Sequence, residues 1–139
     1  MAAPIKVITD AYSIVNVVAN DSDKTILLDG KRQSTVIGIR VDYTASATVA
    51  TRQVVVEFLD SAGNTILEAR AGATQAASEA RIYQFGVGLS DMSSFIDTNF
   101  LTTPIPPVPM SQVDSVRVFD SDATGIATDD MLVSIVCAW

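Results

Sequence analysis

One stretch of the sequence decides the fold class: Thr35-Val-Ile-Gly-Ile-Arg-Val-Asp-Tyr-Thr44. Apolar and polar or small residues alternate along it, with Ile37, Ile39, Val41 and Tyr43 in one set and Gly38, Arg40 and Asp42 in the other. Successive side chains of a β-strand point to opposite faces of a sheet. The alternation therefore predicts a strand that buries one face and exposes the other.

The same period of two returns in segments that follow this strand. It recurs in 48–59 and in 81–89, and Asp60-Ser-Ala-Gly-Asn64 supplies a turn after the first of these. The segments 115–119 and 131–139 are expected to form a final hairpin with a long loop. Short strands bounded by turn residues are typical of antiparallel sheets. We expect the following residues to form the core: Ile37, Ile39, Val41, Val54, Val56, Phe58, Phe85, Phe119 and Val133.

The composition agrees with a β-protein. The 139 residues include 17 valines, 12 isoleucines and 13 threonines but only 7 leucines, and side chains branched at Cβ suit a pleated sheet better than a helix. No sustained amphipathic helix is present to cross over between parallel strands. We therefore predict one all-β domain over residues 1–139, a two-sheet antiparallel β-sandwich of which the jelly roll is one form.

Three segments do not follow the strand pattern. Residues 1–10 are expected to be an extended N-terminal segment, and 90–100 carry the spacing of a short helix. Residues 102–110 hold four of the five prolines. Proline lacks a backbone N–H and favours an extended path, so this segment is predicted to be a stiff connector.

Charge and residue content exclude several functions. Sixteen acidic against nine basic residues give a net charge of −7, the wrong sign for binding nucleic-acid phosphates. Histidine, the commonest general base and metal ligand, is absent. The single cysteine, Cys137, lies in an apolar run and is expected to be buried. Because the sequence shows neither a basic leader nor a long apolar stretch, we expect no membrane partner and assembly in a cytoplasm.

Two groups of acidic residues are candidates for a calcium site and for a catalytic site. The first contains Asp114, Asp120, Asp122, Asp129 and Asp130. Calcium prefers several oxygen ligands, but this run lacks the third acidic position and the closing glutamate of a calcium loop, which favours a solvated turn. Glu57 and Glu68 lie on the two arms of the Gly63 hairpin, where like-charged neighbours on a solvated face are commoner than a paired-carboxylate site. We predict no catalytic, cofactor-binding or metal-binding residues.

The apolar ends of the chain and the proline run are the candidates for contact with a partner. An exposed strand edge can pair with another chain, and prolines lower the entropy that an arm loses on docking. A ligand for an SH3-type groove is less favoured because the run lacks a basic anchor, and both ends could equally be outer strands of the domain's own sheets. The predicted partner-binding residues are Pro4, Ile5, Pro104, Ile105, Pro106, Pro107, Val108, Pro109 and Trp139.

Several segments together resemble a known family. These are the Phe58-Leu-Asp-Ser-Ala-Gly-Asn-Thr-Ile66 hairpin, the proline-rich approach, Val116-Arg-Val-Phe-Asp-Ser121 and Asp129-Asp-Met-Leu-Val133. Within a small acidic sandwich they resemble the capsid decoration, or cement, proteins of tailed bacteriophages. The resemblance implies a structural virion protein with no enzymatic activity, assembled in the host cytoplasm and seated on the outer capsid surface. It also implies two partners, the major capsid protein and further copies of this chain, in a trimer.

Two alternatives remain open at this point. One is a structural component of a phage tail or baseplate. The other is a carbohydrate- or calcium-dependent binding module, because sandwiches commonly present ligand sites on their loops. Sugar-binding platforms usually need exposed aromatic side chains, and the chain has only nine aromatic residues, of which Tyr43, Phe58, Tyr83 and Phe85 are assigned to inward faces.

Overall fold

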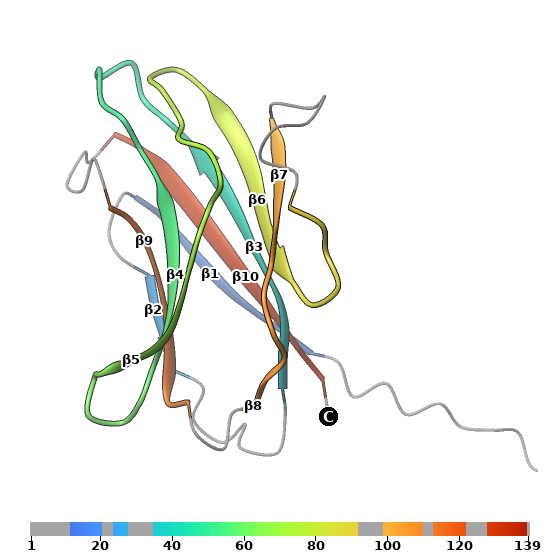
Figure 1. Ribbon diagram of the computed structural model, residues 1–139. Helices are drawn as coiled ribbons and strands as arrows, with labels where there is room; N and C mark the ends of the chain where they lie inside the picture. Colours follow the sequence, from blue (N-terminus) through green and yellow to red (C-terminus); the bar gives the residue numbers. More distant parts are fainter. Residues whose placement is uncertain are drawn as a thin grey trace, which may run out of the picture.

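The computed structural model describes residues 12–20, 24–27, 35–91, 99–109, 113–121 and 128–138. Within them it contains strands and no helix, arranged as two facing sheets (Figure 1). The strands are β1 (Tyr12–Asn20), β2 (Lys24–Leu27), β3 (Thr35–Thr44), β4 (Val54–Leu59), β5 (Thr65–Arg70), β6 (Ala80–Gly86), β7 (Phe100–Pro104), β8 (Val108–Pro109), β9 (Ser115–Asp120) and β10 (Asp130–Ala138). The all-β sandwich predicted from the sequence is therefore confirmed. The helix expected within 90–100 falls mostly on 92–98, outside the described residues.

The order of the strands is that of a jelly roll. One sheet runs β1-β10-β3-β6-β7 and the other β2-β9-β4-β5. The antiparallel pairs β1·β10, β2·β9, β3·β6 and β4·β5 are nested along the chain and alternate between the two sheets, as in a long hairpin rolled onto itself. β7 adds to β6 in parallel, and β8 pairs with the start of β3.

This topology gathers the connections at two ends of the sandwich. Because β3, β5 and β9 all run toward the same end, the β3–β4 and β5–β6 connections lie there together with the end of β9 and the start of β10. In Figure 1 these two connections form the upper rim. No helix in the described part of the chain is long and apolar enough to cross a membrane.

The inward faces of both sheets fill one apolar core. Ile39, Val41, Val54, Val56, Phe58, Phe85 and Val133 are all at most 1% exposed, as predicted. Cys137 is also fully buried.

Two residues that we predicted to be in the core are not there. Ile37 is 37% exposed, whereas its neighbour Val36 is fully buried. The pairing of β10 with β3 shifts at this point, since Val136 lies opposite Gly38 and Cys137 opposite Val36. This irregularity skips Ile37 and reverses the face on which it lies, as a β-bulge does.

Phe119 was the second wrong prediction. In β9 Val116, Val118 and Asp120 form an alternating buried set, and Ser115 at the start of the strand is also buried. Phe119 lies on the opposite, outer face of its sheet and is only half-buried. The guanidinium carbon of Arg117 lies 3.9 Å from the centre of the Phe119 ring. A cation stacked on the ring thus covers an aromatic side chain that the core does not take up.

Candidate functional site

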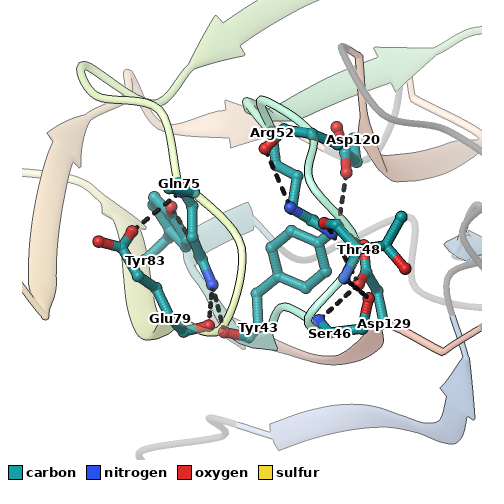
Figure 2. A network of polar contacts seen from close by, with 11 residues as sticks. Tyr43, Ser46, Thr48, Arg52, Gln75, Glu79, Tyr83, Asp120 and Asp129 are labelled. Atoms are coloured by element: carbon teal, nitrogen blue, oxygen red, sulfur yellow. Dashed lines mark hydrogen bonds and ion pairs between the residues drawn. The ribbon is translucent and has the colours of Figure 1, made fainter.

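A buried ion pair lies beneath the loops at the β3–β4 end of the sandwich (Figure 2). The guanidinium of Arg52 donates from Nε to Oδ2 of Asp129 at 2.7 Å and from Nη2 to Oδ1 at 3.0 Å. Both side chains are 0% exposed. This two-point geometry matches the planar fork of arginine to both carboxylate oxygens, which makes it one of the stronger kinds of hydrogen-bonded pair.

The remaining donors of Arg52 close the β3–β4 loop around the guanidinium. Nη1 donates to the carbonyl of Ala50 at 3.1 Å, and Nη2 donates to the carbonyl of Thr48 at 3.0 Å. Between these two carbonyls, Val49 lies at the apex of the loop and is 92% exposed. The arginine therefore fixes, from inside, a loop that presents one apolar side chain outward.

Asp129 also binds β3 and the residues that follow it. Its Oδ1 accepts the backbone N–H of Ser46 at 2.7 Å, and its Oδ2 lies 3.1 Å from the hydroxyl of Tyr43. The same hydroxyl lies 2.5 Å from Oδ2 of Asp120, a carboxylate that is 1% exposed. One tyrosine hydroxyl thus bridges the end of β9 and the residue that precedes β10.

These contacts set the charge state of the pair. Burial alone would raise the pKa of Asp129, but the hydrogen bonds from Arg52, Ser46 and Tyr43 outweigh it and lower the pKa to about 2. The hydrogen bond to Asp129 raises the pKa of Arg52. Both groups are therefore ionised at neutral pH.

Gln75 ties the β5–β6 loop to the same cluster. Its side-chain amide donates to the carbonyls of Tyr43, at 3.1 Å, and Glu79, at 2.5 Å, while its Oε1 accepts the hydroxyl of Tyr83 at 2.9 Å. The backbones of Gln75 and Arg52 exchange two hydrogen bonds of 2.7 and 3.0 Å. Burial raises the pKa of Tyr83 to about 12, so its hydroxyl stays a neutral donor.

The contacts among Tyr43, Arg52, Gln75, Asp120 and Asp129, here called the clamp, join the β3–β4 and β5–β6 loops to the ends of β9 and β10. The carboxylate and amide oxygens of the clamp accept hydrogen bonds from donors of the protein itself. The loop segments 44–51 and 71–78 contain no charged residue. Buried charges of this kind stabilise one loop arrangement because each would be costly without its partner. The loops at this end present small uncharged residues and the exposed side chain of Val49.

The aspartates considered for calcium do not converge. Asp120 and Asp129 accept bonds inside the clamp, Asp114 and Asp130 are exposed, and Asp122 lies outside the described residues. Across the described ranges, no group of three or more acidic or sulfur side chains could hold a metal ion.

The two glutamates are directly opposite each other, as the hairpin suggested, but each has an arginine partner. Glu57 faces Glu68 across β4 and β5. Oε2 of Glu57 lies 3.3 Å from Nη1 of Arg117, and Oε1 of Glu68 lies 2.5 Å from Nε of Arg70. The carboxylates therefore belong to a charged ladder on the outer face of the sheet.

The proline run is part of the sandwich and not a separate arm. Ile105 and Val108, which we predicted to contact a partner, are 5% and 7% exposed and lie in the core. They are buried because β7 and β8 extend the β6 side of the sheet and Ile105 donates its N–H to Gly86 at 3.1 Å. The expectation of a simple connector over 102–110 is corrected in the same way.

The other predicted partner residues have varied positions. Pro104, Pro106 and Pro107 are exposed. Pro109 lies in β8, opposite Thr35. Pro4, Ile5 and Trp139 lie outside the described residues.

A hollow of about 210 Å³ lies between β3 and β6, lined in part by Asp42, Arg81 and Asn99. Small-molecule sites usually have volumes of roughly 300 to 1,000 Å³. The hollow is therefore small for such a site, and the loop end is the better candidate.

Sequence reasoning did not find the clamp. Arg52 and Gln75 were not singled out, and Asp129 was considered only as a metal ligand. One signal was present, because Arg52 is the single charged residue in 43–56. An isolated charge in an otherwise uncharged stretch suggests a buried partner, but it does not identify that partner.

No protein-family model matches the sequence, and no curated protein matches it. Among solved structures, the fold is similar to part of the infectious bursal disease virus Gx strain structure, with 13% identity over 93% of this chain and 32% of that chain and a TM-score of 0.45. It is also similar to part of an exo-beta-agarase, with 9% identity over 93% of this chain and 22% of that one and a TM-score of 0.41. This chain thus spans a third or less of the length of each.

Proposed function

We propose that this chain is a structural virion protein that binds the outer surface of a phage capsid and stabilises contacts between major capsid subunits. The jelly roll is compatible with this role because it is common in capsid domains, although lectin domains and cupins share it. The observation that carries the proposal is the clamped loop end. There, the buried charges serve to hold a contact surface in one shape.

The loop end has the properties of a docking surface. A rigid loop loses little conformational entropy when it binds, so more of the contact energy appears as affinity. Charged residues are depleted at the centres of protein interfaces. The loop segments 44–51 and 71–78 contain none in a chain of net charge −7. The next charged residues along the two loops are Arg52, which is buried, and Glu79, whose side chain is 39% exposed. Val49, 92% exposed at the apex, is the apolar side chain best placed to enter a pocket on a capsid subunit.

The oligomer proposed for this role is a homotrimer, as the family resemblance implies. Repeating one small contact in a closed oligomer adds affinity through multivalency. Pro104, Pro106 and Pro107 supply exposed, stiff surface for contacts between copies or with the capsid. Ile105 and Val108 do not serve in this way because they are buried.

The test is binding to capsids that lack this chain. Shells depleted of it would be mixed with the wild-type chain, with Val49→Asp and with Leu27→Asp, and co-sedimentation would be measured. Leu27 is the matched control because it is another exposed aliphatic residue, 66% exposed on β2. We expect wild type and Leu27→Asp to sediment with the shells, and Val49→Asp to bind about tenfold or more weakly, through burial of a charge in an apolar contact.

Failure of the wild-type chain to sediment with any depleted shell would overturn the capsid role. Equal binding by Val49→Asp would overturn the assignment of the loop end while leaving the capsid role standing. Binding to phage tails or baseplates, or to a glycan array, would support one of the alternative functions. The glycan alternative is less favoured because Tyr43, Phe58, Tyr83 and Phe85 are all at most 1% exposed and offer no sugar platform.

A further inference from the structure

Strand β5 is the last strand of its sheet, and no other described strand pairs with its outer edge. In the order β2-β9-β4-β5, its paired neighbour among the described residues is β4. Ala71 donates its N–H to the carbonyl of Val54 on the β4 side. Because backbone polar groups alternate sides along a strand, those of Leu67 and Ala69 also face β4, and those of Glu68 and Arg70 point to the open edge.

An open edge invites pairing with another chain, and proteins usually block it with charges or a bulge. The irregularity in β5 lies at its hairpin end, where Thr65 pairs with Leu59 and Ile66 is passed over. From Leu67 to Arg70 the strand is regular. The two charged residues on this regular part are Glu68 and Arg70. Because their charges are opposite, they do not repel a strand that carries the complementary charges.

The two charges make the edge complementary to itself. Glu68 and Arg70 lie on the same face of the sheet with Ala69 between them, and their side chains are 36% and 50% exposed. If two β5 strands pair antiparallel about a two-fold axis at Ala69, Glu68 of each copy lies opposite Arg70 of the other. Opposite charges directly across a strand pair are stabilising, and like charges are destabilising.

The other symmetric registers do not fit. Residues whose backbone groups face the open edge must lie opposite one another to exchange both N–H···O bonds. An axis at Glu68 would place glutamate opposite glutamate, and an axis at Arg70 would place arginine opposite arginine. An axis between two residues would place a residue whose backbone groups face the open edge opposite one whose backbone groups are already bonded to β4. Among two-fold axes from Glu68 to Arg70, the charge pattern therefore selects the axis at Ala69.

We infer that β5 pairs antiparallel with β5 of a second copy of this chain, with Ala69 opposite Ala69. The two four-stranded sheets then form one continuous sheet across a two-fold axis, in which the same surface of each copy is used. This contact does not depend on the capsid role. A trimer would have to form through other surfaces.

The experiment measures the mass of the full-length chain in solution by sedimentation equilibrium, over a range of concentrations. Arg70→Glu gives an acidic edge, and Glu68→Arg gives a basic edge. In each variant alone, like charges would face each other across the strand pair, and the affinity of the dimer should fall about tenfold or more. A mixture of the two variants opposes acid to base and should form a heterodimer.

The mixture distinguishes pairing between copies from the ion pair within one copy. Each variant has lost its own Glu68–Arg70 pair, and mixing cannot restore that pair within a chain. Matched controls are Arg40→Glu and Asp42→Arg, which disrupt an exposed pair of the same spacing on β3, a strand with neighbours on both sides. These should dimerise like wild type, and circular dichroism should show that every variant is folded.

Three results would overturn the inference. They are a wild-type chain that stays monomeric up to millimolar concentration, single variants that self-associate as tightly as wild type, and a mixture that associates no better than its components.

Discussion

Replacing Asp129 with asparagine tests the clamp at the loop end most directly. The substitution keeps the size of the side chain and removes its charge. Arg52 would then carry a buried positive charge with no carboxylate beside it, because Asp129 supplies both oxygens of the ion pair, at 2.7 and 3.0 Å. The amide N–H₂ group of asparagine would also replace one acceptor with a donor, facing N–H groups that already donate.

The size of the effect follows from burial. Both side chains are 0% exposed, and removing one partner of a buried pair costs about 3 to 5 kcal/mol. Total stabilities of domains are about 5 to 15 kcal/mol, so the loss is a large fraction of the whole. For a chain of this length it corresponds to a fall in melting temperature of about 10 to 20 °C.

Urea unfolding followed by circular dichroism would measure this loss, and hydrogen exchange of the 46–51 amides would report on the loop itself. The control is Asp42→Asn. It breaks the Arg40–Asp42 pair, which is 48% and 37% exposed, and surface pairs of this kind contribute only about 0 to 1 kcal/mol.

We expect Asp129→Asn to lose both stability and loop protection, and Asp42→Asn to lose neither. Equal, small losses in the two variants would refute the argument that the ion pair holds the loop end together. A large loss of stability with unchanged exchange in 46–51 would show that the pair stabilises the core and not the loops.

Phe58→Ala should lower the free energy of unfolding, measured in urea, by about 3 to 5 kcal/mol because Phe58 is fully buried. Phe119→Ala, on the outer face, should lower it by about 1 kcal/mol. Equal losses would contradict the register of β9. The folded-state pKa of Asp129 is lowered from 3.8 to about 2. The ionised carboxylate therefore contributes about 2 kcal/mol to the free energy of unfolding above pH 4, and this contribution is lost as the pH falls toward 2. Urea unfolding at a series of acid pH values should show this loss in wild type and not in Asp129→Asn. Excess chelator should leave the melting temperature unchanged, and a fall reversed by calcium would identify a metal site in 120–130. A far-ultraviolet circular dichroism spectrum should be dominated by strand, and one dominated by helix would contradict the fold.

The extent to which the site could be foreseen differs between its parts. The inward positions of Tyr43 and Tyr83 followed from alternation along their strands, and both are 1% exposed. The partners of their hydroxyls did not follow, because Asp120 and Gln75 reach them from other elements. The aspartates near the C-terminus looked like solvated turn residues, yet two of them are among the most buried polar groups in the described chain.

The sequence by itself determined the class of the fold and the inward residues of its regular strands. Side-chain alternation is a property of the local backbone, so the period of two in 38–44 and 54–59 is sufficient to identify the core-facing residues. The strand predicted over 48–59 begins only at Val54, because 48–53 forms the β3–β4 loop. The sequence pattern could not locate the bulge at Ile37, because pairing with β10 displaces that residue.

Only the tertiary structure decided which polar groups are buried together and which apolar side chains outside the regular strand pattern are buried. Arg52 and Asp129 are 77 residues apart in sequence, and burying either one is unfavourable unless the fold delivers the other to the same place. Ile105 and Val108 read as a free arm because their prolines break the strand pattern. The closure of β7 and β8 onto the sheet buries them. Both outcomes depend on contacts between distant segments, and local patterns do not contain that information.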